Sequence, residues 1–256
     1  MISKACSTIF LDVRNFTSNL SQHYENDIFI ELIQSIYQYG LDITSKFVEE
    51  KDFYLNSTGD GFVLIVFDEF HYLSAFCISL ILQKEITSFI KETNLLGPNR
   101  EGDYYFGIGL ESGEAKELSA NIGNKRVNTY LGNVINIAAR LEALTKDYSR
   151  APIIYGPELN ELLVKHLFNK SYKKLMDKAK LDDSEDIIDS LHSEMNEINS
   201  KLLSSYLFEH RLKGVQEPQP AFRISPTLSD FTKQSFSDFV NLLPEFYKTK
   251  IREILK

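Results

Sequence analysis

The sequence feature that most constrains the fold is a short hairpin, YLNSTGDGFVLIVF, at residues 54–67. Apolar and β-branched residues on both sides of a turn predict two buried strands that pair with each other. The turn contains Gly59, Asp60 and Gly61, residue types that are common in tight turns. It fixes the Asp60 carboxylate at the edge of a buried strand, where an unpaired charge is costly. The hairpin therefore predicts both a sheet and a polar site at the edge of that sheet.

Strands and helices alternate around this hairpin. Apolar and β-branched runs predict strands, and apolar residues at helical spacing predict amphipathic helices. The resulting β-α-β-β-α-β order is typical of an α+β fold of the ferredoxin-like or palm type, an antiparallel sheet with helices on one face. The expected elements are a strand at 5–13, a helix at 27–49, hairpin strands at 52–57 and 62–67, a helix at 70–93, a strand at 104–115, a strand or loop at 124–131, a helix at 133–146, and a strand with a helix start at 151–159.

The second half of the chain adds three further segments. Residues 169–203 are rich in Lys, Asp and Glu and carry Leu, Ile and Met at helical spacing, which predicts an inserted helical hairpin with a break near 181–183. A strand, a turn and a second strand are expected within 206–224. The last segment, 227–256, has the pattern of two short amphipathic helices.

Composition is that of a soluble globular protein, with 43% hydrophobic residues among 256. Lys plus Arg number 28 against 36 Asp plus Glu, and this net charge of −8 leaves no basic footprint for nucleic acid or an anionic membrane. Cys6 and Cys77 match no metal spacing and fit a reducing compartment. Because the longest apolar stretch, around 75–82, is short for a membrane span and no signal peptide is evident, we expect a cytoplasmic protein.

Two carboxylates are expected at the ends of buried strands, Asp12 after the first strand and Asp60 in the hairpin turn. The first and third strands of a β-α-β-β core lie side by side, so the two carboxylates can converge at one edge of the sheet. Such a pair, with few basic residues nearby, is a natural site for Mg²⁺ or Mn²⁺, because hard cations take oxygen ligands. The alternative is that Asp60 only favours the turn and that Asp12 only caps the next helix.

An anion site is expected beside these carboxylates. The stretch VRNFTSN after Asp12 offers backbone N–H groups and a Thr/Ser cap at the start of a helix, which favours phosphate binding. We assign Asn15, Phe16 and Thr17 to this role. Every helix has an N-terminus, so this feature alone does not define a site, but together with two acidic groups it describes a two-metal phosphoryl-transfer site.

The helix at 133–146 carries Asn136 and Arg140 one turn apart, on the same face. An arginine in this position can be an ordinary solvated residue. The functional alternative is that Arg140 stabilises the charge that develops on a transferring phosphoryl group, while Asn136 holds a ribose.

Five stretches of the chain together resemble the successive signature blocks of the class III nucleotidyl cyclases. They are TIFLDVRNFTS, NSTGDGFVLIVF, GIGLESGEA, LGNVINIAARLEALTK and LKGVQEPQPAFRI. The resemblance covers roughly 5–160 and 206–224 in the order of the family, which makes it specific although no single block is. It implies a phosphorus-oxygen lyase that converts a nucleoside triphosphate to a 3′,5′-cyclic monophosphate and pyrophosphate.

The same resemblance implies roles for individual residues. Asp12 and Asp60 match the metal-binding aspartates of the family, with the carbonyl of Val13 as an extra ligand, and Asn136 and Arg140 match its transition-state residues. Because enzymes of the family are dimers with active sites between subunits, the aspartates of one chain are expected to work with Asn136 and Arg140 of the other.

The resemblance also implies two Mg²⁺ or Mn²⁺ ions in each site. One ion would lower the pKa of the ribose 3′-hydroxyl, and the other would bind the triphosphate. Lys213 in the closing block is the candidate triphosphate-binding lysine. We expect one cyclase domain at 1–225, with its insert at about 169–203, and a C-terminal helical extension at 226–256.

The expected base pocket departs from that of purine-specific members of the family. They read the base with Lys and Asp, or with Glu and Cys, at two positions that correspond to Asn56 and Thr129. An asparagine donates and accepts hydrogen bonds at once, which suits the edge of uracil or cytosine. Tyr54, on the same strand face as Asn56, either contacts the base or packs in the core, with packing favoured, and Arg100 is a further base or phosphate contact.

This pocket, the acidic insert and the lack of a sensor domain are similar to the bacterial pyrimidine cyclases of Pycsar anti-phage systems. That likeness implies a homodimer that makes cUMP, favoured over cCMP, for a separate effector that senses it. One alternative is an adenylate or guanylate cyclase with an altered base pocket. Another is a catalytically silent regulatory module with the same fold.

Overall fold

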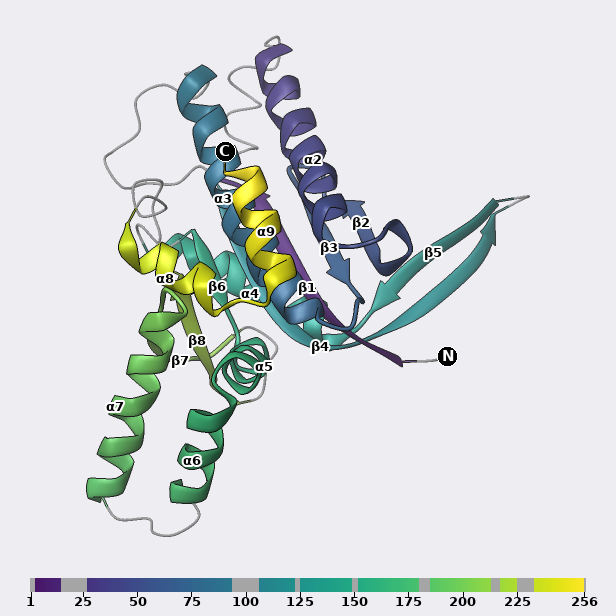
Figure 1. The fold of residues 1–256 in the computed structure, drawn as a ribbon. Helices are drawn as coiled ribbons and strands as arrows, with labels where there is room; N and C mark the ends of the chain where they lie inside the picture. The colour runs from purple at the N-terminus through teal and green to yellow at the C-terminus, as the bar shows by residue number, and fades with distance from the viewer. Residues whose placement is uncertain are drawn as a thin grey trace.

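The computed structural model describes residues 3–14, 27–93, 106–122, 125–148, 152–179, 185–212, 217–224 and 233–255 (Figure 1). Most predicted elements are present at close to their expected positions. In chain order they are β1 (Ser3–Val13), α2 (Asp27–Phe47), β2 (Phe53–Ser57), β3 (Gly61–Val66), α3 (His71–Thr93), β4 (Phe106–Ile122), β5 (Lys125–Leu131), α4 (Asn133–Leu144), β6 (Ile153–Tyr155), α5 (Pro157–Leu167), α6 (Asn169–Ala179), α7 (Glu185–Lys201), β7 (Ser204–His210), β8 (Gln219–Ile224), α8 (Gln234–Leu242) and α9 (Glu245–Ile254), with short 3₁₀ turns at Glu50–Asp52 and Thr145–Asp147.

The strands form one sheet in the order β2-β3-β1-β4-β6-β8-β7, and β5 pairs with β4 outside this path. Neighbouring strands are antiparallel, except that β6 runs parallel to β4. The central strand β1 lies between β3 and β4, so it is paired along both edges. The predicted α+β class and its β-α-β-β-α-β core are confirmed.

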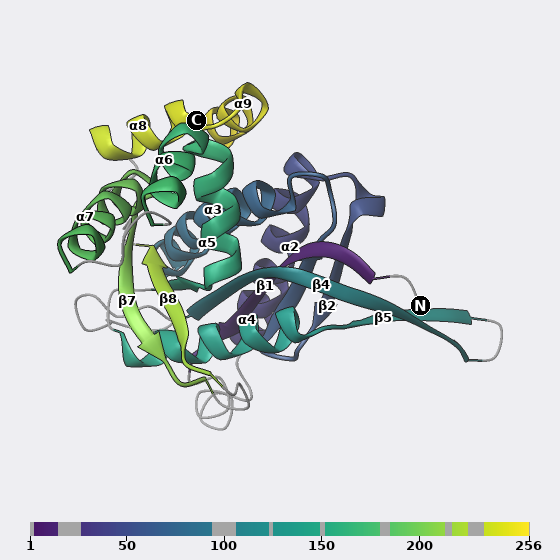
Figure 2. The same ribbon diagram turned by 90° about the horizontal axis from the view of Figure 1, so that it is seen from below.

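Helices cover both faces of the sheet (Figure 2). On β1, Ile9 and Leu11 point into the main core with α2 and α3, whereas Cys6 points to the opposite face, where it joins Val134 of α4. This alternation follows from the two-residue period of a strand. The prediction of helices on one face therefore holds for α2 and α3, but α4 lies on the other face, because its own apolar stripe also requires cover.

The close approach of α4 to the sheet depends on glycines in β4. A Cβ atom at Gly109 would lie 2.0 Å from the carbonyl oxygen of Ala138 and 2.3 Å from the backbone nitrogen of Glu142. Backbone atoms cannot move aside as a flexible side chain can, so this contact requires the missing side chain. The glycines of the GIG run thus let the end of α4 lie directly against β4.

The strands β4 and β5 extend as a two-stranded ribbon beyond the body of the protein (Figure 1). Pairing with β1 ends at Lys116, whereas β5 pairs with β4 from Lys116 to Ile122. The sequence predicted a strand only to residue 115, although Leu118, Ala120 and Ile122 continue an alternation with polar residues, so the true end of β4 was missed.

Two predicted helical additions are present. Helices α6 and α7 project from the body as a pair (Figure 1), and Lys178 of α6 donates to Ser190 and Glu194 of α7. The C-terminal helices α8 and α9 join the main core, where Tyr247 bonds Ser74 of α3 with the two hydroxyl oxygens 2.9 Å apart. The described C-terminal residues, 233–255, are therefore packed onto the same core as the sheet.

Helix α3 is long and apolar enough, over the 22 residues His71–Glu92, to cross a membrane by length and composition alone. No other helix in the described part of the chain has this property. However, 72% of the most apolar window is buried within the protein. This is the position of a core helix, between the sheet and α5 and α9.

Candidate active site

The hairpin turn between β2 and β3 is tied directly to the end of β1. Asp12 pairs with Gly61 in the strand register, and the backbone N–H of Val13 donates to the carbonyl oxygen of Asp60 at 3.1 Å. A Cβ atom at Gly61 would lie 1.9 Å from the carbonyl oxygen of Leu11, so any side chain there would push the two strands apart. The predicted convergence of Asp12 and Asp60 at one sheet edge is therefore present in the structure.

Glycine is also required at the corner of this turn. Gly59 has a φ angle of +103°, in a region of backbone conformation that other residues rarely adopt. Its N–H donates to the hydroxyl of Ser57 at 3.1 Å, and the N–H of Thr58 donates to the carbonyl of Gly61 at 3.0 Å. The turn thus has its own hydrogen bonds, which hold the Asp60 backbone in place.

The electrostatics of the pair are unfavourable for a full negative charge. Burial raises the pKa of Asp12 to about 6, and the negative charge of Asp60 and a hydrogen bond between the two carboxyl groups act in the same direction. The ammonium of Lys146, 3.5 Å from the Asp12 carboxylate, partly opposes this shift. The two carboxylates therefore favour a cation between them.

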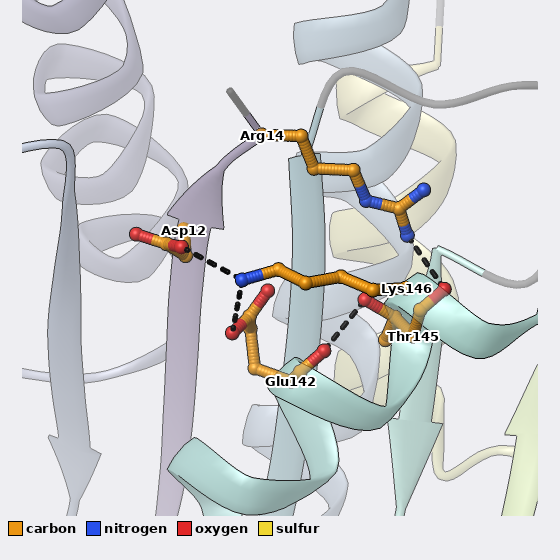
Figure 3. A network of polar contacts seen from close by, with 5 residues as sticks. All are labelled: Asp12, Arg14, Glu142, Thr145 and Lys146. Atoms are coloured by element: carbon orange, nitrogen blue, oxygen red, sulfur yellow. Dashed lines mark hydrogen bonds and ion pairs between the residues drawn. The ribbon is translucent and has the colours of Figure 1, made fainter. Parts of the chain in front are cut away.

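A network of polar side chains that the sequence analysis missed lies beside Asp12 (Figure 3). Glu142 of α4 is buried, and Lys146 Nζ lies 3.9 Å from its carboxylate. Burial, together with the charge of Asp12, raises the pKa of Glu142 to about 7 although Lys146 acts in the opposite direction. The available signal was the position of Glu142 one turn after Ala138, on the buried stripe of α4, where a carboxylate is unusual.

The donor set fits a divalent cation. Asp12 and Asp60 offer hard oxygen ligands at one sheet edge, and their mutual repulsion would be relieved by a bound cation. Among the described residues, no group of three or more His, Cys, Asp or Glu side chains is placed to hold a metal ion. A metal at this site would therefore also need backbone, water or substrate oxygens, and the role of the Val13 carbonyl remains a prediction.

Asn136 and Arg140 lie on the exposed face of α4. At 100° per residue, Arg140 is about 200° around the helix from the buried Glu142, so it points away from the Asp12 site of the same chain. The two residues share one face, as the sequence predicted. Within a single chain they do not converge with the aspartates.

Asn56 and Thr129 are both exposed, on β2 and β5. Tyr54, two residues before Asn56 and on the same face of β2, meets Tyr130, the residue after Thr129 on β5, with ring centroids 5.0 Å apart. Because successive residues of a strand point to opposite faces, Thr129 faces away from this contact. One chain therefore does not bring the two candidate base-reading residues together, and the Tyr54 ring lies against that of Tyr130.

Some predicted site residues lie outside the described part of the chain. They are the phosphate-binding candidates Asn15, Phe16, Thr17 and Lys213, and the base or phosphate contact Arg100.

No protein-family model matches the sequence. Over 147 residues, 57% of the chain, it is 23% identical to an adenylate cyclase of Anabaena cylindrica, and the match spans only 28% of that protein. The adenylyl cyclase CyaB of Pseudomonas aeruginosa has a similar structure, with a TM-score of 0.61 and 16% identity over 90% of this chain and 97% of that one. The guanylate cyclase domain of RhGC from Catenaria anguillulae, solved with GTP, gives a TM-score of 0.55 and 14% identity over 88% of this chain and 98% of that one. The fold is that of class III adenylyl and guanylyl cyclase domains.

The raised pKa of Asp12 has a testable consequence for stability without metal. The pKa of the Asp12 carboxyl group is near 4 in the unfolded chain and about 6 in the folded protein. The contribution of this group to stability is therefore fully present below about pH 4 and is lost as the pH rises through about 6. We expect Asp12→Asn to stabilise the metal-free protein by about 2 kcal/mol at about pH 7.5 and not at about pH 4. Urea unfolding in a chelator measures both values.

The matched control is Asp189→Asn on α7, which removes an exposed carboxylate far along the chain from the site. It should change the free energy of unfolding little at either pH. An Asp12→Asn variant that gained nothing at the higher pH, or the same amount at both, would contradict the electrostatic description of the pair.

Proposed function

We propose that this protein is a nucleotidyl cyclase that converts a nucleoside triphosphate to the 3′,5′-cyclic monophosphate and pyrophosphate. The observation that carries the proposal is the convergence of Asp12 and Asp60 at one edge of a cyclase-type sheet. In this reaction the ribose 3′-oxygen forms a bond to the α-phosphorus and the α–β phosphoanhydride bond breaks. The proton of the 3′-hydroxyl passes to water, and pyrophosphate leaves with the bonding electron pair.

The residues of the chain would contribute mainly position and charge. Asp12 and Asp60 would hold Mg²⁺ or Mn²⁺, which when bound lowers the pKa of the attacking hydroxyl and neutralises phosphate charge. Arg140 would stabilise the charge that develops on the α-phosphoryl group, and Asn136 would orient the ribose. Each of these side chains is needed at a different part of the same nucleotide.

We further propose that the working form is a homodimer with composite sites. The support is the orientation of α4, whose Asn136 and Arg140 are exposed and point away from the Asp12 site of their own chain. A second copy related by a two-fold axis would supply them, and each dimer would then have two equivalent sites. The same arrangement would let Thr129 of one chain face Asn56 of the other.

Mixing two inactive variants tests the composite site. Asp60→Ala and Arg140→Ala should each lose nearly all activity, because each removes one half of every site. After equal mixing and exchange, half of the dimers are mixed and carry one intact site of two, so activity should return to about a quarter of the wild-type value. A mixture that stays inactive, while exchange is verified by tagged subunits, would contradict the shared site.

For the substrate we propose a pyrimidine nucleoside triphosphate, with UTP favoured over CTP. The support is that Asn56 is a short, neutral and exposed group four residues before Asp60, where a charged purine-reading side chain is missing. An amide can donate and accept, as the N3 and O4 edge of uracil requires. The product would then be cUMP, a second messenger of anti-phage defence in the cytoplasm, sensed by a separate effector.

The second candidate is a purine cyclase with an altered base pocket. It is favoured by the sequence similarity to a protein described as an adenylate cyclase. It differs from the first only in the base that the pocket accepts, so the same assay separates the two.

Incubation of the purified protein with Mn²⁺ and each of the four triphosphates tests the substrate. We expect cUMP as the main product, some cCMP, and cAMP and cGMP lower by at least about tenfold, because a pocket built for one hydrogen-bonding edge rejects another. Asp60→Ala, the control, should make none of them. Dominant cAMP or cGMP would overturn the pyrimidine assignment. No product from any triphosphate would favour a silent regulatory module with the same fold.

A further inference from the structure

The ammonium of Lys146 lies between two carboxylates at the proposed cation site (Figure 3). Its Nζ atom is 3.5 Å from Asp12 Oδ2 and 3.9 Å from Glu142 Oε2. Asp12 comes from β1, whereas Glu142 and Lys146, far away in sequence, come from the end of α4 and from the 3₁₀ turn Thr145–Asp147 that follows it. None of the roles proposed above uses Lys146.

The backbone that carries Lys146 is held firmly in place. The hydroxyl of Thr145 donates to the carbonyl of Glu142 at 2.6 Å, and Arg14 Nη2 donates to the carbonyl of Thr145 at 2.8 Å. A Cβ atom at Gly107 would lie 2.3 Å from the Thr145 hydroxyl, so β4 also has room for this turn only because of a glycine. These contacts direct the lysine side chain toward Asp12.

The Lys146 side chain is far more exposed than the carboxylates beside it. It is 50% exposed, whereas the carboxylates that it contacts are 20% exposed for Asp12 and 4% exposed for Glu142. The backbone of Lys146 is thus anchored, while half of its side chain lies in solvent. Its four-carbon chain can leave Asp12 without any change in the turn.

We propose that Lys146 is an internal counterion that takes the place of the divalent cation at Asp12 and leaves Asp12 when that cation binds. The inference rests on the proposed cation site at Asp12 and Asp60. Mg²⁺ binds a carboxylate oxygen at about 2.1 Å, and an ammonium at contact distance from the same carboxylate would be strongly repelled by it.

This exchange has two consequences for the enzyme. The aspartate pair is compensated in the metal-free protein, which limits its mutual repulsion while the site is empty of substrate. Cation binding in the absence of nucleotide is weakened, because the cation must first displace Lys146. The site therefore favours a cation that arrives with additional ligands, such as those of a nucleotide triphosphate.

Lysine footprinting of the wild-type protein tests the exchange directly. Acetylation with a reactive ester, read by mass spectrometry without nucleotide, should label Lys146 about threefold more in saturating Mg²⁺ than in a chelator, because a released ammonium is more accessible. Lys201, which is 49% exposed and pairs with Glu197, is the matched control and should not change. In Asp12→Asn the dependence on Mg²⁺ should disappear. Equal labelling of Lys146 with and without Mg²⁺ would overturn the proposal.

Calorimetric titration with Mn²⁺ gives a second readout that needs no catalysis. Lys146→Met should bind Mn²⁺ about tenfold more tightly than wild type, since no positive charge has to be displaced, and Lys201→Met should bind as wild type does. Unchanged or weaker binding by Lys146→Met would overturn the counterion role. If wild type binds Mn²⁺ through Asp12 but Lys146 does not respond, only this inference fails. If wild type binds no Mn²⁺, the proposed cation site fails with it.

Discussion

The antiparallel pairing of β1 with β3 is the constraint on which the rest of the site depends. Their register sets Asp12 opposite Gly61, and the hydrogen bond from Val13 to Asp60 holds the turn against the end of β1. Both strands are central to a sheet buried by helices, so the register cannot slip without moving every apolar residue to the wrong face. The stability of the core thereby keeps the carboxylates of Asp12 and Asp60 close together despite their like charges.

In the proposed homodimer, helix α4 would serve two sites, because its two faces point in different directions. The buried face lies against β4, where Gly109 permits close approach, and it brings Glu142 to the Asp12 site. The opposite face of α4 exposes Asn136 and Arg140 to solvent. A single helix thus supports the carboxylate end of one proposed active site and completes the proposed active site of a partner.

The sequence was most informative where chemistry and local structure coincide. The Gly59-Asp60-Gly61 turn identified the hairpin and the edge carboxylate, since both follow from local rules. The sequence was less informative about the β4–β5 ribbon, which continues beyond the pairing with β1, and about the face of the sheet that α4 covers. Glu142 and Lys146 were missed because their meeting with Asp12 is a tertiary contact, which depends on how α4 lies on β4.

The most direct test of the account is a crystal structure with Mn²⁺ and a non-cyclisable UTP analogue. We expect anomalous scattering from Mn²⁺ at Asp12 and Asp60, with the α-phosphate facing Asn136 and Arg140 from a second copy of the chain. Mn²⁺ bound away from the two aspartates, or a nucleotide held by residues of one chain only, would contradict it.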